Sequence, residues 1–500
     1  MKASVATAGT LLLGCGERGC GSSRPDSREK KQADVVVVGA GLSGLMTARE
    51  LVKAGVGAVL VLEARERVGG LTVSQSVAEG VMVDGGGQWV GDAHTRILAL
   101  AEELGVPTTE SYGTGVPVFF FDGVRMAGTG QVFDGVRMPG TGQVFTHADK
   151  DELVQVRKKL AEMAAELPLG AAWDAPRAAE YDKLTMFNWL RDNTTLQGVR
   201  RTIDYAINFT FGAKPEDISL LCFLVAVRAC GGLESLLATS DSQEMSFEGG
   251  SQRLSLRMAE ELGDRVILGS PVRRIVHHPA GPARVETDRL VIEAGRVVVA
   301  MMPADTRRIE FEPKLPQMRR RLARNWTGVP DYKVHVVYKT PFWRDLQLSG
   351  TAIGDDTVVD FVFDSSPPGG SPGVLLAFGA GDQLPSDVGS RKDAVTAALA
   401  KFFGNEALTP TGFVEMDWMG EAWSTGCASP LKPGVLSAYG RALREPVGRI
   451  HWAGTDTSVV WNGFMEGAVR SGERVAGEVV AALREGGIAV PAAAPPATSG

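Results

Sequence analysis

The sequence predicts an α/β protein whose parallel sheet is assembled from distant parts of the chain, combined with a second unit of α+β type. Three observations support this fold class. Val35–Val38 is a short apolar run bounded by glycine, which is typical of a strand buried on both faces. A second such strand, Val297–Ala300, recurs much later in the chain, and Gly448–Glu473 has a strand–loop–helix pattern near the far end. The predicted sheet is therefore discontinuous in sequence.

The first strand ends in Gly39-Ala40-Gly41-Leu42-Ser43-Gly44, which has the G-x-G-x-x-G spacing. A helix is expected from Leu45 to Lys53, and a second strand, Val59–Leu62, then delivers Glu63 about 20 residues beyond the glycines. In this setting the glycines allow a tight turn, close approach of a pyrophosphate and close packing of helix on strand. The pyrophosphate would lie at the helix N-terminus, and the acid would accept hydrogen bonds from a ribose. The pattern is weak by itself, but between two strands it predicts a dinucleotide site.

The next segment, Glu63-Ala64-Arg65-Glu66-Arg67-Val68-Gly69-Gly70, resembles the start of the FAD-dependent amine oxidase family. That family includes monoamine, putrescine, polyamine and aminopolyol oxidases and L-amino-acid oxidases. The resemblance implies a Rossmann-type FAD-binding domain, with Arg65 and the Gly69-Gly70 pair along the ribityl-phosphate chain. The family usually continues with Arg-Thr, whereas this chain has Leu71-Thr72, so no role is transferred to Leu71.

Composition narrows the class of protein. The chain has 500 residues, 44% of them hydrophobic, and can bury a sizeable core. A formal charge of −7 without a basic block argues against nucleic acid as a partner. The five cysteines are too scattered for a disulfide framework, and no C-x-x-C pair or histidine cluster predicts a metal site. No apolar run is long enough to predict a membrane-spanning helix.

The two ends of the chain are set apart from the predicted globular part. Leu12-Leu13-Gly14-Cys15 resembles a lipoprotein cleavage box, so residues 1–31 are interpreted as an export or lipid-anchor leader with a polar tether. The alternative is a cytoplasmic protein with a disordered alanine-rich leader. Residues 486–500 are expected to form a disordered tail.

Between these ends we predict two interleaved domains. The FAD-binding domain would comprise residues 32–107, 246–320 and 421–485, and a substrate-binding domain of mixed β-sheet and helices would comprise 108–245 and 321–420. From Asp149 to Leu237 apolar residues recur at helical spacing, which resembles the family's helical cap over the substrate. A twelve-residue duplication within 121–144 predicts a lengthened β-hairpin.

Further segments gain roles from the resemblance. Asp84–Trp89 would pass close to the flavin ring, the backbone at Val272 would contact adenine, and the loop Ala453–Asp456 with a helix from about Gly463 would face the flavin pyrimidine. There the helix dipole would stabilise negative charge as the flavin is reduced. The predicted cofactor-binding residues are Gly39, Gly41, Leu42, Ser43, Gly44, Glu63, Ala64, Arg65, Gly69, Gly70, Gly86, Gly87, Gln88, Trp89, Val272, Trp418, Cys427, Gly454, Thr455, Asp456, Gly463, Phe464 and Met465.

The resemblance also implies catalytic and substrate-pocket residues. Val329–Arg344 alternates as a strand and places Lys333 where the family has a buried lysine that holds a water beside flavin N5; the alternative is a lysine on a solvated face. Monoamine oxidases flank the amine with two aromatic rings, and here those positions are Phe464 and Ala428, so half of the pair is present. Cys230 is a further candidate for the substrate pocket. Cys427 lies where animal monoamine oxidases attach FAD through a thioether, the alternative being a buried thiol.

The predicted function is FAD-dependent oxidative deamination of a primary amine, with a small-molecule amine and O₂ as partners. Hydride would pass from the amine carbon to flavin N5, the imine would hydrolyse to an aldehyde or ketone plus ammonia, and O₂ would be reduced to H₂O₂. An L-amino-acid oxidase is the alternative; it requires a cation for the substrate carboxylate, and the pocket segments offer no assignable arginine, with Arg228 the one position left open. A catalytically silent flavin-binding scaffold is the alternative of another class. The sequence does not determine the size class of the substrate. It does not determine the oligomeric state either, for which a homodimer is one option.

Overall fold

A computed structural model describes residues 27–121, 123–128, 147–237, 244–329, 331–354, 358–380, 384–418, 420–426 and 429–486. Several features singled out in the sequence lie outside these ranges. They are the Leu12–Cys15 motif, most of the duplication within 121–144, Cys427, Ala428 and residues 487–500.

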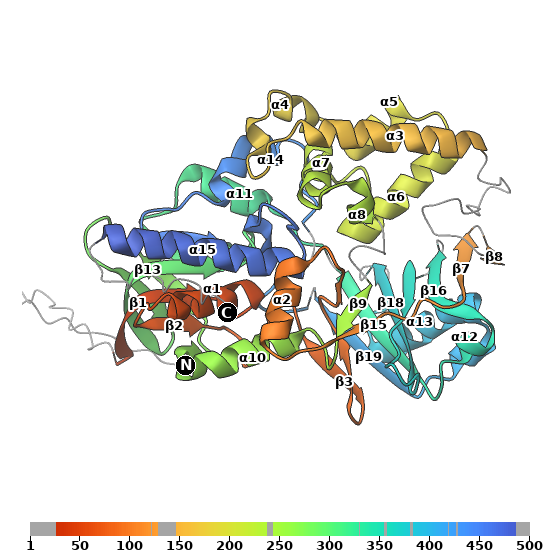
Figure 1. Cartoon of the computed structure of the whole chain (residues 1–500), viewed down its shortest axis with the longest axis horizontal. Coiled ribbons are helices and arrows are strands. Elements are labelled where there is room, and N and C mark those ends of the chain that lie inside the picture. The colour runs from red at the N-terminus through yellow and green to blue at the C-terminus, as the bar shows by residue number, and fades with distance from the viewer. Residues whose placement is uncertain are drawn as a thin grey trace, which may run out of the picture.

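The first sheet has eight strands from three separate stretches of the chain (Figure 1). Its order is β10 (Val266–Ile267), β2 (Val59–Leu62), β1 (Glu29–Val38), β13 (Leu290–Ala300), β12 (Ala283–Thr287), β11 (Val272–Val276) and β14 (Glu310–Glu312), with β20 (Ile450–Ala453) also paired to β13. The pairs β10–β2, β2–β1, β1–β13 and β13–β20 are all parallel. The carboxyl ends of these strands therefore meet at one edge of the sheet.

Strand β1 is buried on both faces, as the valine run predicts. Val35 and Val37 pack into a core with α1 (Leu42–Lys53), α2 (Thr95–Glu103), α10 (Gln252–Leu262) and α15 (Met465–Glu485). Val36 and Val38 pack into a second core with residues of β11, β12 and β20. Because β1 also pairs with β2 on one edge and with β13 on the other, its end is held in place, and with it the start of the glycine junction that follows.

A second sheet forms the base of the other unit. Its order is β19 (Gly412–Asp417), β15 (Asp331–Tyr338), β18 (Gly373–Ala380), β17 (Phe361–Asp364), β16 (Leu348–Gly354), β7 (Val116–Phe121) and β8 (Val124–Ala127). All pairs are antiparallel except β16–β7. Tyr332, Val334, Val336 and Tyr338 of β15 face a core with Trp343 of α12 (Phe342–Asp345) and with α13 (Val388–Phe403), so the opposite residues of β15 point to the first unit.

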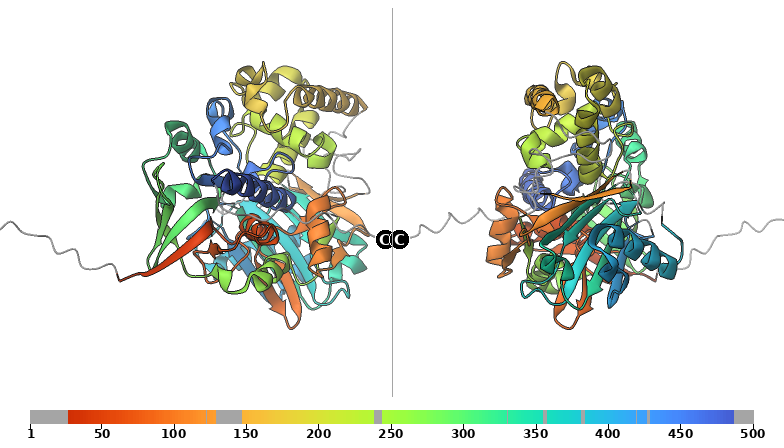
Figure 2. Two further views of the ribbon diagram at one scale, coloured as in Figure 1. Left: turned by 60° about the vertical axis from the view of Figure 1, so that its left-hand side comes forward. Right: turned by 90° about the vertical axis from the view of Figure 1, so that its right-hand side faces the viewer.

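Helices form a third layer, which lies on one side of both sheets in each view of Figure 2. They are α3 (His147–Ala165), α4 (Ala178–Tyr181), α5 (Met186–Asn193), α6 (Gln197–Phe211), α7 (Leu220–Ala229) and α8 (Leu233–Leu237), joined by α11 (Gln317–Asn325) and α14 (Val435–Tyr439). Their apolar faces share one core. Two small sheets, β3 (Ser74–Ala78) with β4 (Val81–Asp84), and β5 (Trp89–Val90) with β9 (Met245–Phe247) and β6 (Thr108–Glu110), connect the units. No helix in the described ranges is long and apolar enough to cross a membrane.

The structure corrects two predicted boundaries. The helix expected from Leu45 begins at Leu42, because the second half of the glycine motif already forms its first turn. The strand expected over Val329–Arg344 ends at Tyr338, after which Phe342–Asp345 forms a short helix behind Pro341. Proline lacks a backbone N–H and favours the start of a helix over continuation of a strand.

Candidate active site

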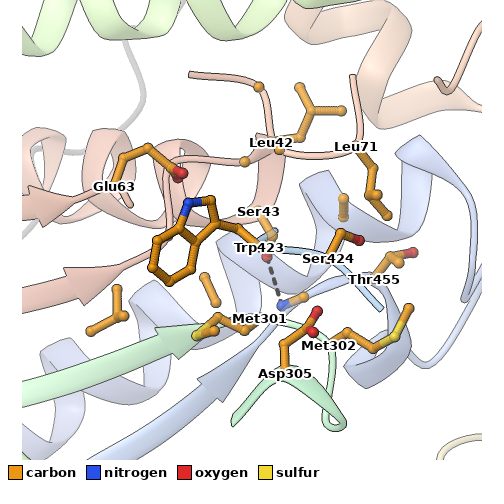
Figure 3. Close-up of a pocket in the computed structure, with 18 of the residues that line it drawn as sticks. Leu42, Ser43, Glu63, Leu71, Met301, Met302, Asp305, Trp423, Ser424 and Thr455 are labelled. Carbon is orange, nitrogen blue, oxygen red and sulfur yellow. Dashed lines mark hydrogen bonds between the residues drawn. The ribbon is translucent and has the colours of Figure 1, made fainter. Parts of the chain in front are cut away.

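A cavity opens where the parallel strands of the first sheet end. It is lined by Val38 and Gly39 at the end of β1, by Leu62 and Glu63 at the end of β2, by Ala300 to Met302 at the end of β13, and by Gly454 directly after β20. In open α/β sheets the carboxyl ends of the strands are where ligands bind. The same cavity also reaches Pro271 and Val272 on one hand, and Phe464 and Met465 on the other. Figure 3 shows side chains from these separate segments gathered around it.

The glycine junction leaves the N-terminus of α1 open to the cavity. Gly41 precedes the helix and makes no side-chain cap, so the N–H groups of the first turn are available to a ligand. Gly39 has φ +102°, and a Cβ on Gly44 would lie 2.0 Å from the carbonyl oxygen of Gly39. At Gly41, by contrast, the nearest protein atom to an added Cβ is Gly70 Cα at 3.8 Å, so the room beside Gly41 belongs to the cavity.

Glu63 places a buried carboxylate at the end of β2. Its Oε2 accepts the N–H of Ala40 at 2.8 Å and its Oε1 accepts the N–H of Arg65 at 3.0 Å. Each oxygen thus keeps capacity for a hydroxyl donor from the cavity. The Arg65 Nε lies 3.4 Å from Glu421 Oε2 as an ion pair, yet has no hydrogen-bond partner among the described residues. A donor and an acceptor therefore lie side by side where a dinucleotide would need them.

Two hydroxyls fix the loop that follows β20. Ser43 Oγ accepts the N–H of Gly454 at 2.9 Å, which ties α1 to the loop after β20. Thr455 Oγ1 accepts the N–H of Gly463 at 2.9 Å and donates to the carbonyl of Phe464 at 2.7 Å. Phe464 is the N-cap of α15, and its side chain is in the cavity wall. These bonds fix the turn that delivers the aromatic residue.

Lys333 lies on the inner face of the second sheet and reaches toward the first unit. Its Nζ donates to the Gly86 carbonyl at 2.8 Å and to Gln88 Oε1 at 2.9 Å, and it lies 5.6 Å from the centroid of Trp89. The residue is only 3% exposed, so the solvated-face alternative is wrong. Gln88 in turn donates to Ser365 Oγ at 3.1 Å, which holds the amide in place.

The buried carboxyl of Asp84 and the half-buried carboxyl of Asp456 flank this region. Burial raises the pKa of Asp84 to about 6, although Lys333 opposes the shift and Ser251 donates to Asp84 Oδ1 from its backbone N–H at 2.8 Å and its hydroxyl at 2.9 Å. Burial likewise raises the pKa of Asp456, which lines the cavity, to about 6. Nearby hydrogen-bond donors and cations therefore offset only part of the cost that burial imposes on the charged form of each carboxyl group.

Most of the predicted cofactor residues come together at this cavity. Those that line it are Gly39, Gly41, Leu42, Ser43, Glu63, Ala64, Arg65, Gly69, Gly70, Gly87, Val272, Gly454, Thr455, Asp456, Gly463, Phe464 and Met465. Gly44, Gly86, Gln88, Trp89 and Trp418 are not in its lining, and neither is the predicted catalytic residue Lys333. Some of these residues bond to the backbone just before Gly87. Trp418, for example, donates its indole N–H to the Gly85 carbonyl at 3.0 Å.

Cys230 is not brought to this cavity. It follows α7, is 3% exposed and packs in the helical core, where burial raises the pKa of its thiol. In this environment Cys230 behaves as a small apolar side chain and not as a reactive thiol. The nearby Arg228, the candidate cation of the alternative substrate class, donates from Nε to the Leu167 carbonyl at 3.2 Å within the same layer.

Sequence reasoning missed several residues of the cavity wall. They include Thr72, Pro271, Met301, Met302, Asp305, Arg308, Ile309, Trp423 and Ser424. Met301 and Met302 directly follow a predicted buried strand, so the rule that ligands bind at strand ends could have found them. Trp423 and Asp305 carried no comparable local signal, because only the tertiary fold brings their segments together.

The cavity fits FAD on these grounds. It joins an uncapped helix N-terminus, a buried carboxylate with spare acceptor capacity, a buried guanidinium nitrogen without a hydrogen bond and a glycine with space beside it. Together with the parallel sheet, these features define a dinucleotide-binding protein.

Comparison with known proteins then gives the family. The model of the flavin containing amine oxidoreductase family matches residues 42–480. AofH of Mycobacterium tuberculosis, named as a flavin-containing monoamine oxidase, is 40% identical over 90% of this chain and 97% of its own. L-amino acid dehydrogenase of Synechocystis is 33% identical over 90% and 95%. A solved structure of putrescine oxidase bound to putrescine is 33% identical, has a TM-score of 0.82, and matches over 90% of this chain and 100% of that chain.

The chain belongs to the flavin-containing amine oxidoreductase family. This confirms the fold class and the family predicted from sequence, and with them an amine-oxidising flavoenzyme. Family membership implies FAD as the cofactor.

Proposed function

We propose that the protein catalyses FAD-dependent oxidative deamination of a primary amine, with O₂ as the final acceptor. The observation that carries the proposal is the buried Lys333, whose amine group donates to the Gly86 carbonyl and to Gln88, the two sequence neighbours of Gly87 in the cavity wall. FAD, when bound, supplies the electron sink, and the protein supplies binding, orientation and electrostatics.

The residues of the first sheet would hold the cofactor. The open N-terminus of α1 suits a pyrophosphate, and Glu63 suits a ribose hydroxyl. Residues Gly454 to Asp456 and the start of α15 would face the redox-active ring. There the positive end of the α15 dipole would stabilise negative charge.

Phe464 and Lys333 would act on the amine side. The Phe464 ring offers an apolar wall, and such a wall favours the neutral amine because desolvation penalises the ammonium. The neutral form carries the lone pair that the reaction needs. Lys333, with its amine group fixed by two acceptors, would hold a water molecule close to Gly87.

A primary amine without a carboxylate is favoured over an L-amino acid. An amino acid needs a cation for its carboxylate, and the arginines among the described lining residues are Arg65 and Arg308. Arg65 pairs with Glu421 and Glu63, and Arg308 Nε lies 3.4 Å from Asp305. Both are therefore neutralised by carboxylates. The relation to an L-amino acid dehydrogenase keeps the alternative worth an explicit test.

Covalent attachment of FAD through Cys427 is part of the proposal. Ser424, three positions earlier, lines the cavity, which supports a thioether from this segment. Acid precipitation of the purified yellow protein tests it, since a covalent flavin stays with the pellet.

The function is tested by H₂O₂ release from purified protein with benzylamine, putrescine, a long-chain aminoalcohol and several L-amino acids. Peroxide from amines alone supports the proposal and identifies the size class of the substrate. Peroxide from amino acids alone would transfer the protein to the alternative. Bound flavin without any turnover would favour the silent scaffold.

A further inference from the structure

Helices α2 and α15 lie next to each other in Figure 1 and are in contact, and α15 begins directly after Phe464. His94 precedes α2 but makes no side-chain cap for it. Glu466 of α15 caps α2 instead, because its carboxylate accepts the N–H of Arg96 at 3.1 Å and of Ile97 at 2.8 Å. Arg470 Nε donates to the same carboxylate at 2.6 Å, and Glu466 is fully buried. The first turn of α15 is thus bonded to the start of α2, two residues beyond Phe464.

An aromatic cluster lies at the same junction. The ring of His94 meets that of Trp461 edge to face, with centroids 4.3 Å apart and planes at 85°, and lies 5.7 Å from Phe464. Trp461 and Phe464 are also edge to face, at 5.2 Å. Rings in this arrangement attract one another beyond their buried area. The Phe464 ring is therefore supported by both neighbours.

His94 is held in one tautomer of the neutral ring. Its Nδ1 accepts the N–H of Gly91 at 3.4 Å, which assigns the remaining proton to Nε2. That nitrogen has no hydrogen-bond partner among the described residues, and the residue is 1% exposed, so the ring contacts are what hold this edge of the imidazole.

Trp461 adds a fixed backbone turn. Its φ is +53°, a left-handed conformation that non-glycine residues adopt at a cost. The turn persists because its N–H donates to the Ala229 carbonyl at 3.0 Å and its carbonyl accepts the N–H of Phe464 at 3.1 Å. The backbone of Phe464 is thus tied to Thr455 and Trp461, while its ring has His94 and Trp461 as neighbours.

We infer that Glu466 and His94 are positioning residues that fix the Phe464 ring at the cavity wall and thereby set which amines fit. Glu466 acts by holding the start of α15 against α2, and His94 acts through ring contact. The inference rests on the proposed function, because it takes the Phe464 ring as the wall that faces the amine. Small displacements of a wall that orients a substrate have large kinetic effects.

Glu473 provides a matched control. It also belongs to α15 and also binds Arg96, but through the arginine side chain at an exposed site, with Nε 3.0 Å from Oε1. Glu466→Gln removes the charge that caps the backbone, whereas Glu473→Gln removes only a surface ion pair. Exposed pairs of this kind contribute little.

The experiment measures flavin content, kcat and KM for benzylamine and for putrescine in the wild-type protein and both variants. We expect Glu466→Gln to keep its flavin and to change the ratio of the two kcat/KM values about fivefold, mainly through KM. Glu473→Gln should stay within about twofold of the wild type. An unchanged ratio in Glu466→Gln, or an equal change in Glu473→Gln, overturns the inference.

A second pair of variants covers the case in which Glu466→Gln does not fold. His94→Phe keeps a ring edge beside Trp461, whereas His94→Ala removes it. His94→Phe should retain the wild-type ratio, and His94→Ala should change it about fivefold. Identical ratios in the two variants refute the role of His94. Wild-type protein that oxidises no amine refutes the proposed function itself, and the inference with it.

Discussion

Replacement of Gly44 by alanine is the sharpest test of the cofactor cradle. The new Cβ would lie 2.0 Å from the Gly39 carbonyl oxygen and 3.2 Å from Ala300 Cβ, whereas real Cβ atoms stay at least 3.0 Å from such neighbours. The start of α1 and the end of β1 must therefore separate by about 1 Å, because the obstacle is backbone and not a flexible side chain. Overpacking of this kind costs about 3 kcal/mol, of which alanine's higher helix propensity returns about 1 kcal/mol.

The displaced groups are those expected to meet the pyrophosphate. We predict that Gly44→Ala is purified with less than about a tenth of the wild-type flavin content and unfolds at lower urea concentration. Gly477→Ala is the control, because Gly477 is also helical, lies in α15 and has no atom within 4 Å of an added Cβ. It should gain about 1 kcal/mol and keep its flavin. Wild-type flavin content and stability in Gly44→Ala would refute the reasoning.

Three further predictions follow from the site. Lys333→Met should lower kcat/KM about 100-fold, because methionine has no amine group to hold the proposed water molecule. Flavin content should be retained, because Lys333 is not among the residues that line the cavity, and unchanged kinetics would exclude its role. Burial next to Arg470 lowers the pKa of His94 to about 4. As the pH falls, the unfolded chain therefore binds a proton at this histidine at a higher pH than the folded protein does. Stability should therefore drop by up to about 3 kcal/mol between pH 6.5 and pH 4, and urea titrations should show a shallower drop in His94→Phe. Cys427→Ala should move the flavin from the acid pellet to the supernatant, and a flavin that is soluble already in the wild type would exclude the thioether.

The first two strands of the parallel sheet could be predicted from short stretches of the sequence. Val59–Leu62 was predicted with the bounds of β2, and Val35–Val38 lies within β1, because a strand buried on both faces is apolar at every position. The start of α1 was predicted too late, since Leu42, Ser43 and Gly44 serve both as ligand-binding turn and as first helical turn. Residue types alone do not show whether such a segment is a ligand-binding turn or the first turn of a helix.

The site was predictable where a glycine pattern marks a close approach of backbone and ligand. It was not predictable at Trp423 or Asp305, whose segments reach the cavity only through tertiary packing. The burial of Lys333 is an intermediate case. The alternation of residues along β15 predicts which face of the sheet carries the Lys333 side chain. That this face is closed to solvent depends on its contact with Gly86 and Gln88, which only the structure shows.

The most direct test of the proposed amine oxidation is peroxide release by the purified yellow protein with primary amines, compared with L-amino acids under the same conditions. We predict steady H₂O₂ formation with at least one of benzylamine, putrescine or the long-chain aminoalcohol, and none with amino acids. Turnover of amino acids alone, or bound flavin without turnover of any substrate, would contradict this function.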